Sequence, residues 1–254
     1  MMRQLQNCFV AAICSMGLLA CAAPRLTAAN VPEPTPIVSP AVSGSALVQG
    51  LSMEEIVERL DRGNAQRAAA LHGFEGKRSY HLTYHGFPNT REAEMEVVAH
   101  YSAPESKSFD VVSENGSKML HNKVLRKLLE TEREAAGSES QRETALTPDN
   151  YSFLLVGSRP SANGGCYRLT VEPKRNNKLL YRGEICVNAA DFAVESIDAE
   201  PAKNPSFWIK KTRIEHRYQK VGEFWLPASN KSVTNVRMGG TATLDIVYSA
   251  YELR

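Results

Sequence analysis

From Tyr151 to the C-terminus the sequence reads as one strand after another, with no helix-forming segment between them. Apolar and polar residues alternate along these segments, most regularly at Ala242, Leu244, Ile246 and Tyr248, which is the pattern of strands with one buried face. Strands that follow each other without a helical crossover pair antiparallel. This region therefore predicts an antiparallel meander, with strands at 151–157, 192–199, 207–221, 223–238 and 241–253 and a hairpin between Cys166 and Cys186.

The hairpin between these two cysteines offers a disulfide. Folded symmetrically about a turn at 174–177, its strands bring Cys166 opposite Cys186 and Arg168 opposite Glu184. An ion pair across the strands would stabilise that register, and the two sulfurs would lie close enough to bond. In an oxidising compartment the pair forms a disulfide. In a reducing one, the two cysteines are simply small residues on one face of the hairpin.

Two helices are expected in the first half of the domain. Ser52 and Glu55 form a capping box before an apolar stripe, so a helix begins after Ser52. It continues to about residue 70, although Gly63 weakens it by roughly 1 kcal/mol. The second helix covers 118–136, where one side is apolar and the other is rich in glutamate. Residues 137–148 are polar and are expected to form a loop.

A β-hairpin and a third strand are expected between the two helices. Tyr80, Leu82 and Tyr84 share one face of the first strand. After a turn at 87–90, the return strand carries Met95 and Val97 on its apolar face. Pairing Leu82 with Met95 and Tyr80 with Val97 gives a register that buries both sets together. A further strand follows from about residue 109 and ends at 115–116, an Asn-Gly sequence.

The first 21 residues are typical of an export signal, since a basic residue precedes an apolar stretch that is too short to span a bilayer. Two cleavage sites compete. The sequence at 18–21 resembles a lipobox, which would leave Cys21 to carry lipid, whereas ordinary signal peptidase would cut after Ala29. Residues 22–50 are rich in Pro, Ala and Ser and are expected to be a linker. The folded domain is therefore expected at 51–254.

Charge and motifs exclude several functions. Without the signal, 29 basic residues stand against 28 acidic residues, which gives no electrostatic footprint for nucleic acid. The sequence contains no phosphate-binding loop, nucleophile elbow, dinucleotide fingerprint or metal-binding motif. His81 and His85 share a strand face but lie about 13 Å apart, too far to bind one ion. We therefore expect no catalytic residues, no metal and no cofactor.

Aromatic residues and prolines recur at particular places along the C-terminal strands. They occur in Asn150-Tyr151-Ser152-Phe153, in Tyr167-x-Leu169 running into Pro173, and at 202–209, 222–227 and 248–251, and a Gly183-x-Ile185 strand lies between the second and third of these. With the helix after Ser52 and the hairpin that follows, this arrangement resembles the LolA/LolB-like lipoprotein-sorting proteins of the bacterial envelope. The resemblance implies an α+β fold: a strongly curved antiparallel β-sheet, or incomplete barrel, with a few helices covering its concave face.

The resemblance also implies a function. The concave face of such folds receives acyl chains of lipoproteins or other lipids, without catalysis, in the periplasm or cell envelope during lipoprotein sorting to the outer membrane. The candidate cavity residues on the sheet are Tyr80, Leu82, Tyr84, Val97, Tyr101, Leu169, Val171, Ile246 and Tyr248, and Leu120, Val124 and Leu128 would form a lid. The same residues fit a plain core, so either the helices fill the concave face or a space remains for an apolar ligand.

The chain departs from the family in two places. Lipid on Cys21 would make it a membrane-anchored acceptor or an envelope lipid-binding protein, anchored to the outer membrane, instead of a soluble carrier. The Cys166–Cys186 pair has no match in the family pattern. Two other classes stay open: an envelope module that binds a protein partner, as in anti-sigma-factor signalling, and a secreted enzyme. The first predicts an exposed apolar patch without a cavity, and the second a cleft with converging titratable groups.

Overall fold

The computed structural model describes residues 50–254 apart from 88, 105, 205–206 and 238. The expected export signal, Cys21, the cleavage site after Ala29 and residues 22–49 of the expected linker lie outside the described residues. Within the described part of the chain, no helix is both long and apolar enough to cross a membrane.

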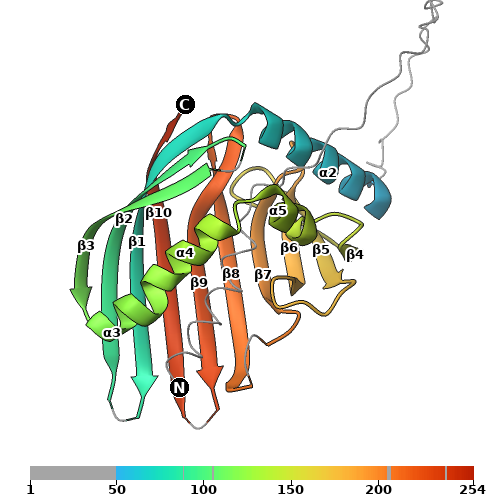
Figure 1. The fold of residues 1–254 in the computed structure, drawn as a ribbon. Coiled ribbons are helices and arrows are strands. Elements are labelled where there is room, and N and C mark those ends of the chain that lie inside the picture. Colours follow the sequence, from blue (N-terminus) through green and yellow to red (C-terminus); the bar gives the residue numbers. More distant parts are fainter. Residues whose placement is uncertain (1–49, 88, 105, 205–206, 238) are drawn as a thin grey trace, which may run out of the picture.

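Ten strands form one antiparallel sheet (Figure 1). Their order is β3-β2-β1-β10-β9-β8-β7-β6-β5-β4, so neighbours in space are neighbours in sequence everywhere except where β1 pairs with β10. The sheet does not close, and β3 and β4 are its two edges. The strands are β1 (Gly73–Gly86), β2 (Arg91–Ser102), β3 (Ser106–Gly116), β4 (Tyr151–Arg159), β5 (Cys166–Pro173), β6 (Tyr181–Asn188), β7 (Val194–Pro201), β8 (Ile209–Val221), β9 (Phe224–Val236) and β10 (Gly240–Leu253).

Helices cover one face of this sheet. The first, α2 (Met53–Ala70), packs over the β4–β7 end. After β3 the chain crosses the sheet as α3 (Lys118–Leu120), a π-helical turn (His121–Leu125), α4 (Arg126–Glu134) and α5 (Ser138–Thr144). In Figure 1 these helices lie in front of the strands, on a single connection between the two edges. The predicted α+β fold, a curved antiparallel sheet with a few helices, is confirmed.

The helix α2 begins where its capping box predicts. Ser52 Oγ accepts a hydrogen bond from the Glu55 backbone N–H at 3.2 Å, and Glu55 Oε2 accepts one from the Ser52 backbone N–H at 2.9 Å. The helix continues through Gly63 to Ala70, and its buried apolar residues are Ile56, Val57 and Leu60. These side chains hold α2 against the sheet, so its first turn contributes to the stability of the whole domain.

Replacing Ser52 by Ala is expected to lower the free energy of unfolding by about 1 kcal/mol, because it removes the acceptor at the start of α2. Urea denaturation followed by circular dichroism would measure the change. A Ser52→Asp variant keeps an acceptor at this position and is expected to retain most of the stability. Equal losses in the two variants would show that the cap does not stabilise the helix.

The helix α5 differs from the loop expected at 137–148. Its sequence is polar and shows no apolar stripe, so periodicity gives no helical signal there. Side chains near its ends stabilise it instead. Gln141 Nε2 donates to the Ala136 carbonyl at 2.6 Å, and Asn150 Nδ2 donates to the carbonyls of Arg142 and Ala145, each at 2.9 Å. The helix therefore depends on a residue that lies beyond it in the sequence.

The first hairpin has the predicted faces but a different register. Tyr80 lies opposite Met95 and Leu82 opposite Ala93, whereas the sequence predicted Val97 and Met95 as their partners. The register is therefore shifted by two residues. Because side chains alternate with a period of two, this shift leaves the same residues on the buried face. The apolar pattern alone does not distinguish the two registers.

The cysteine hairpin shows the same kind of shift. Cys166 lies opposite Asn188, and Arg168 lies opposite Cys186. The predicted partners are instead diagonal neighbours, which still meet. Cys166 and Cys186 form the predicted disulfide with a Cα–Cα distance of 5.6 Å, and Arg168 donates to both carboxylate oxygens of Glu184 at 2.9 and 2.6 Å.

Candidate functional site

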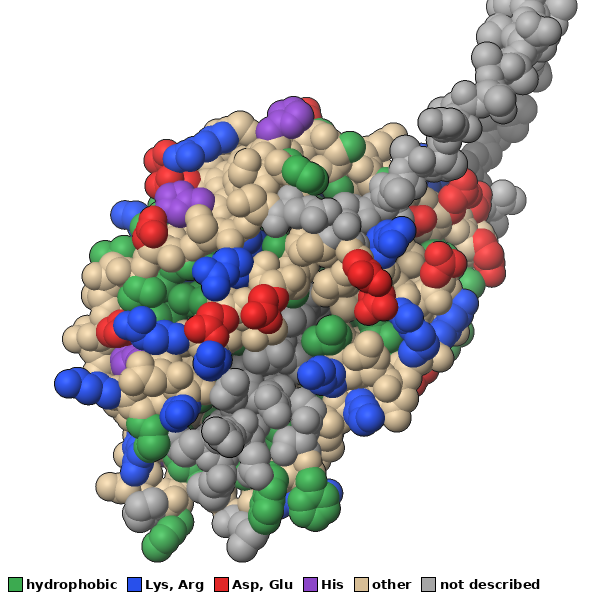
Figure 2. All heavy atoms as spheres, viewed as in Figure 1, with side chains coloured by type: hydrophobic (Ala, Val, Ile, Leu, Met, Phe, Trp, Pro, Cys, Tyr) green, Lys and Arg blue, Asp and Glu red, His purple; other side chains and the backbone are tan. Residues whose placement is uncertain are grey.

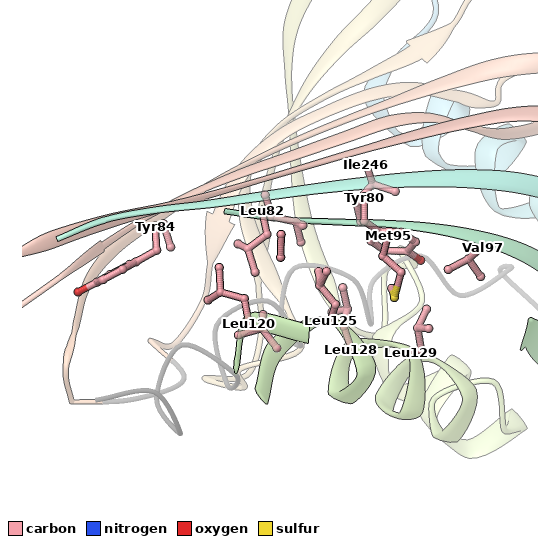
Figure 3. Packing of buried hydrophobic residues seen from close by; sticks show 14 of the residues in the cluster. Tyr80, Leu82, Tyr84, Met95, Val97, Leu120, Leu125, Leu128, Leu129 and Ile246 are labelled. Atoms are coloured by element: carbon pink, nitrogen blue, oxygen red, sulfur yellow. The ribbon is translucent and has the colours of Figure 1, made fainter. Parts of the chain in front are cut away.

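One apolar cluster joins β1, β2 and β10 to the helical connection. In Figure 3, Leu120, Leu125 and Leu128 point from the helices toward Tyr80 and Leu82 of the sheet. Nine of the predicted cavity residues belong to this cluster, and each of them is at most 4% exposed. They are Tyr80, Leu82, Tyr84, Val97, Leu120, Val124, Leu128, Ile246 and Tyr248. These side chains pack against one another here, and their contact with a ligand stays a prediction.

The remaining predicted cavity residues lie elsewhere. Leu169 and Val171 belong to a second cluster, in which α2 packs on β4–β7. Tyr101 belongs to a third and smaller cluster, where its ring lies 5.4 Å from that of Phe74. The structure therefore divides the predicted set among three clusters and does not bring it together at one site.

A cavity of about 110 Å³ lies where α2, α4 and α5 meet the sheet. None of the twelve predicted residues, all of which the structure describes, lines it. Its apolar lining includes Phe74, Leu146, Val194, Ile197, Leu226 and Tyr251, and its polar lining includes Asn64, Arg67, Arg78, Lys107 and Glu132. One sequence signal points to it. Arg78 is a charged residue on the same face of β1 as Tyr80, Leu82 and Tyr84, where the alternation calls for an apolar side chain.

Three charged side chains meet beside this cavity. Glu132 of α4 accepts hydrogen bonds from Arg78 of β1 and Lys107 of β3, each at 2.8 Å. The three side chains are only 4–9% exposed. Burial alone would raise the pKa of Glu132, but the charges and hydrogen bonds of Arg78 and Lys107 outweigh burial and lower that pKa to about 2. Glu132 is therefore ionised at neutral pH, and two basic side chains share its carboxylate.

The guanidinium of Arg78 is further fixed by aromatic side chains. Its central carbon lies 5.0 Å from the ring centre of Phe109 and 5.1 Å from that of Tyr248, and Nη1 also donates to the Tyr80 hydroxyl at 3.3 Å. Cation–π contacts of this kind stabilise a desolvated arginine. Burial raises the pKa of Tyr80 to about 12, so this hydroxyl stays protonated and does not serve as a general base.

A second polar group lines the cavity from α2. Arg67 donates to Asn64 Oδ1 at 2.8 Å and to the backbone carbonyl of Asp191 at 3.0 Å. The same Asp191 accepts hydrogen bonds from Lys220 and Trp225 through its carboxylate at 2.8 and 2.9 Å. Asn64 is 9% exposed, and its Nδ2 has no hydrogen-bond partner among the described residues. Asn64 is thus a residue of the cavity wall that carries a buried amide donor without a partner in the described part of the chain.

These groups offer hydrogen-bond donors, one carboxylate and apolar side chains that can contact a ligand. Cys166, Cys186 and Glu195 are the one set of metal-type ligands with suitable spacing in the described part of the chain, but both sulfurs belong to the disulfide. On the face drawn in Figure 2, Lys and Arg side chains lie among Asp and Glu side chains. That mixture differs from the basic surface that nucleic acid requires.

The chain is similar to known proteins only over part of its sequence or at low identity. Residues 145–251, less than half of the chain, match a family of unknown function (DUF5686). No curated protein matches the sequence.

Among solved structures, the chain is similar to a DUF1329 family protein from Desulfovibrio piger, with 12% identity and a TM-score of 0.39 over 79% of this chain and 92% of that one. A LolA superfamily protein from Nitrosomonas europaea has 10% identity and a TM-score of 0.32, over 81% of this chain and 94% of that one. A domain from Vibrio parahaemolyticus named for outer membrane lipoprotein sorting has 8% identity and a TM-score of 0.38, over 79% of this chain and 93% of that one. The predicted resemblance is thus confirmed as a loose similarity of structure, which does not bear on function.

Proposed function

We propose that this chain is a non-catalytic protein of the bacterial cell envelope that binds acyl chains of lipoproteins or other lipids between its sheet and its helices. The observation that supports this most directly is the partly apolar cavity of about 110 Å³ beneath α2, α4 and α5. Ligand sites are concave and mostly apolar, with a few polar groups that fix orientation. Apolar burial contributes about 0.8 kcal/mol per methylene, so binding of a chain needs no covalent step.

The helical connection is suited to act as a cover over such a site. It spans the sheet from edge to edge, and its apolar side rests on residues of β1, β2 and β10. A displacement of α4 and α5 would join the cavity to the apolar cluster that contains Tyr80 and Leu128. The predicted cavity residues of this cluster would then contact a long acyl chain. In the arrangement described above, in which α4 rests on the sheet, they contact one another.

The proposed location is the periplasm or the outer-membrane side of the envelope. The disulfide between Cys166 and Cys186 supports this location, because such bonds form and persist in oxidising compartments. We further propose that Cys21 carries a lipid anchor and that residues 22–50 link it to the domain. With this anchor the protein would receive a ligand at a membrane, in the role of an acceptor for lipoprotein sorting.

A protein-binding module is the second candidate. Both edge strands expose apolar side chains, with Val112 of β3 67% exposed and Leu154 of β4 65% exposed. An exposed edge can accept a strand from a partner, which gives backbone hydrogen bonds and side-chain contacts together. Binding of an envelope protein would then take place at the edges, while the cavity would be an ordinary packing defect.

Native mass spectrometry of the full chain, exported from a bacterial host, tests the first proposal. We expect an acyl lipid or lipopeptide to remain bound and to appear after organic extraction. Ala68 of α2 lines the cavity, whereas Ala69 of the same helix is exposed. Ala68→Phe is therefore expected to reduce the bound fraction severalfold by filling the cavity, and Ala69→Phe to leave it unchanged. A clean unliganded mass in the parent protein, without uptake of a fluorescent fatty acid, would favour the protein-binding module.

A further inference from the structure

The charged cluster beside the cavity, formed by Arg78, Lys107 and Glu132, has a net positive charge. Arg78 and Lys107 carry two positive charges, and Glu132, the carboxylate to which both bind, carries one negative charge. The side chains are at most 9% exposed, so bulk water screens them little. A buried charge without a partner is unfavourable. An anion in the cavity would complete the pairing.

Donors for such an anion are present in the cavity wall. Within the described part of the chain, the ammonium of Lys107 has Glu132 Oε1 as its partner, and an ammonium offers three donors. The buried Nδ2 of Asn64 has no partner among the same residues. Both residues line the cavity, one from β3 and one from α2. Carboxylate and phosphate oxygens are acceptors that match these donors.

The rest of the wall is suited to hydrocarbon. Phe74 and Tyr251 face each other edge to face with ring centres 5.4 Å apart, and Val194, Ile197 and Leu226 line the same cavity. A free inorganic anion would leave these side chains without a partner. A molecule that has an anionic group at one end and hydrocarbon at the other would contact both parts of the wall.

We infer that the cavity selects an anionic amphiphile, whose carboxylate or phosphate lies against Lys107 and Arg78 and whose first carbons lie against Phe74 and Tyr251. This inference rests on the proposed function and adds the chemical class of the ligand. A cavity of about 150 Å³ can hold one benzene molecule, so 110 Å³ accommodates a head group with the first carbons. The remainder of a longer chain requires α4 and α5 to move.

The charged cluster also ties α4 to β1 and β3, and a purely structural role would need no ligand. A binding test on the full chain distinguishes the two roles. Dodecanoate, dodecyl phosphate and neutral dodecanol would compete with a fluorescent acyl probe at about pH 8, where the carboxylic acid is ionised. We expect both anionic ligands to bind at least about tenfold more tightly than dodecanol, as charge-assisted hydrogen bonds add to the apolar contact.

Variants identify the residues that provide this preference. Lys107→Met retains the hydrocarbon stem and leaves Arg78 paired with Glu132, so the cluster becomes neutral and the protein is expected to fold. The affinity ratio of dodecanoate to dodecanol is expected to fall close to one. Asn64→Asp, which places a like charge in the wall, is expected to lower the ratio independently. Lys77→Met is the matched control, because Lys77 is exposed on β1, and its ratio is expected to equal that of the parent.

Each other outcome has a separate meaning. Equal binding of dodecanoate and dodecanol by the parent protein would overturn the inference and leave the proposed function standing. A preference that survives both Lys107→Met and Asn64→Asp would also overturn it, since the anion would then lie elsewhere. If acetate or inorganic phosphate displaced the probe as effectively as dodecanoate, the inference of an amphiphile would be overturned, and the ligand would be a free anion. Failure of all three C12 ligands to bind would overturn the proposed function itself.

Discussion

Replacing Glu132 by Gln is expected to lower the free energy of unfolding by about 3–5 kcal/mol, the usual cost of removing one partner from a buried ion pair. The variant leaves Arg78 and Lys107 close together without a carboxylate between them. Their repulsion would weaken the attachment of α4 to β1 and β3. A change of this size would remove a large part of the stability of an ordinary domain.

Urea denaturation followed by circular dichroism and by tryptophan fluorescence would measure this loss. Glu134→Gln is the matched control, because Glu134 ends the same helix and is exposed. It is expected to change stability by less than about 0.5 kcal/mol, as surface substitutions usually do. If Glu132→Gln and Glu134→Gln were equally stable, the charged cluster would not hold α4 in place.

The same residue predicts how stability depends on pH. The pKa of Glu132 is about 2 in the folded protein, below its ordinary value of 4.5. Its contribution to stability is therefore fully present above about pH 4.5 and is lost as the pH falls toward 2. Glu132→Gln should lack this part of the acid transition. A parent and variant that lose stability in parallel between these pH values would contradict the assignment.

Removing the Cys166–Cys186 disulfide is expected to lower the free energy of unfolding by about 3 kcal/mol, since the bond closes a loop of roughly 20 residues in the unfolded chain. The cysteines are 20 positions apart and nearly fully buried. A Cys166→Ala, Cys186→Ala double variant, compared with the parent by urea denaturation, would measure the loss.

Reductant provides the control for this experiment. Dithiothreitol should destabilise the parent by a similar amount and leave the double variant unaffected. A parent protein that is insensitive to reductant under unfolding conditions would show that the bond adds no stability.

The positions of the strands could be predicted from the sequence, but their registers could not. Alternation places Tyr80, Leu82 and Tyr84 on one face whether Leu82 pairs with Met95 or with Ala93. The choice depends on the geometry of the turn and on neighbouring strands, which the pattern does not contain. The helix α5 was missed for a related reason, because the contacts of Asn150 that close its end are tertiary.

The candidate site was harder to predict than the fold. The sequence identified apolar residues of the concave face and left open whether they pack against one another, as most of them do, or surround a ligand. The cavity instead depends on how far α2, α4 and α5 lie from the sheet. Its charged residues come from α2, β1, β3 and α4, four separate elements of the chain. Arg78, a charged residue in an apolar alternation, was the available clue, and Glu132 and Lys107 become recognisable only as its partners.

The pairing of β1 with β10 has a consequence for how the chain folds. Tyr80 lies opposite Ile246, so two strands from opposite ends of the domain are neighbours in the middle of the sheet. Such non-local pairing is slow to form, because a long loop must close first. The sheet cannot be completed while the last strand is still being synthesised. Until that strand has left the ribosome, the edge of β1 that pairs with β10 stays open, so the chain depends on its final residues for its finished shape.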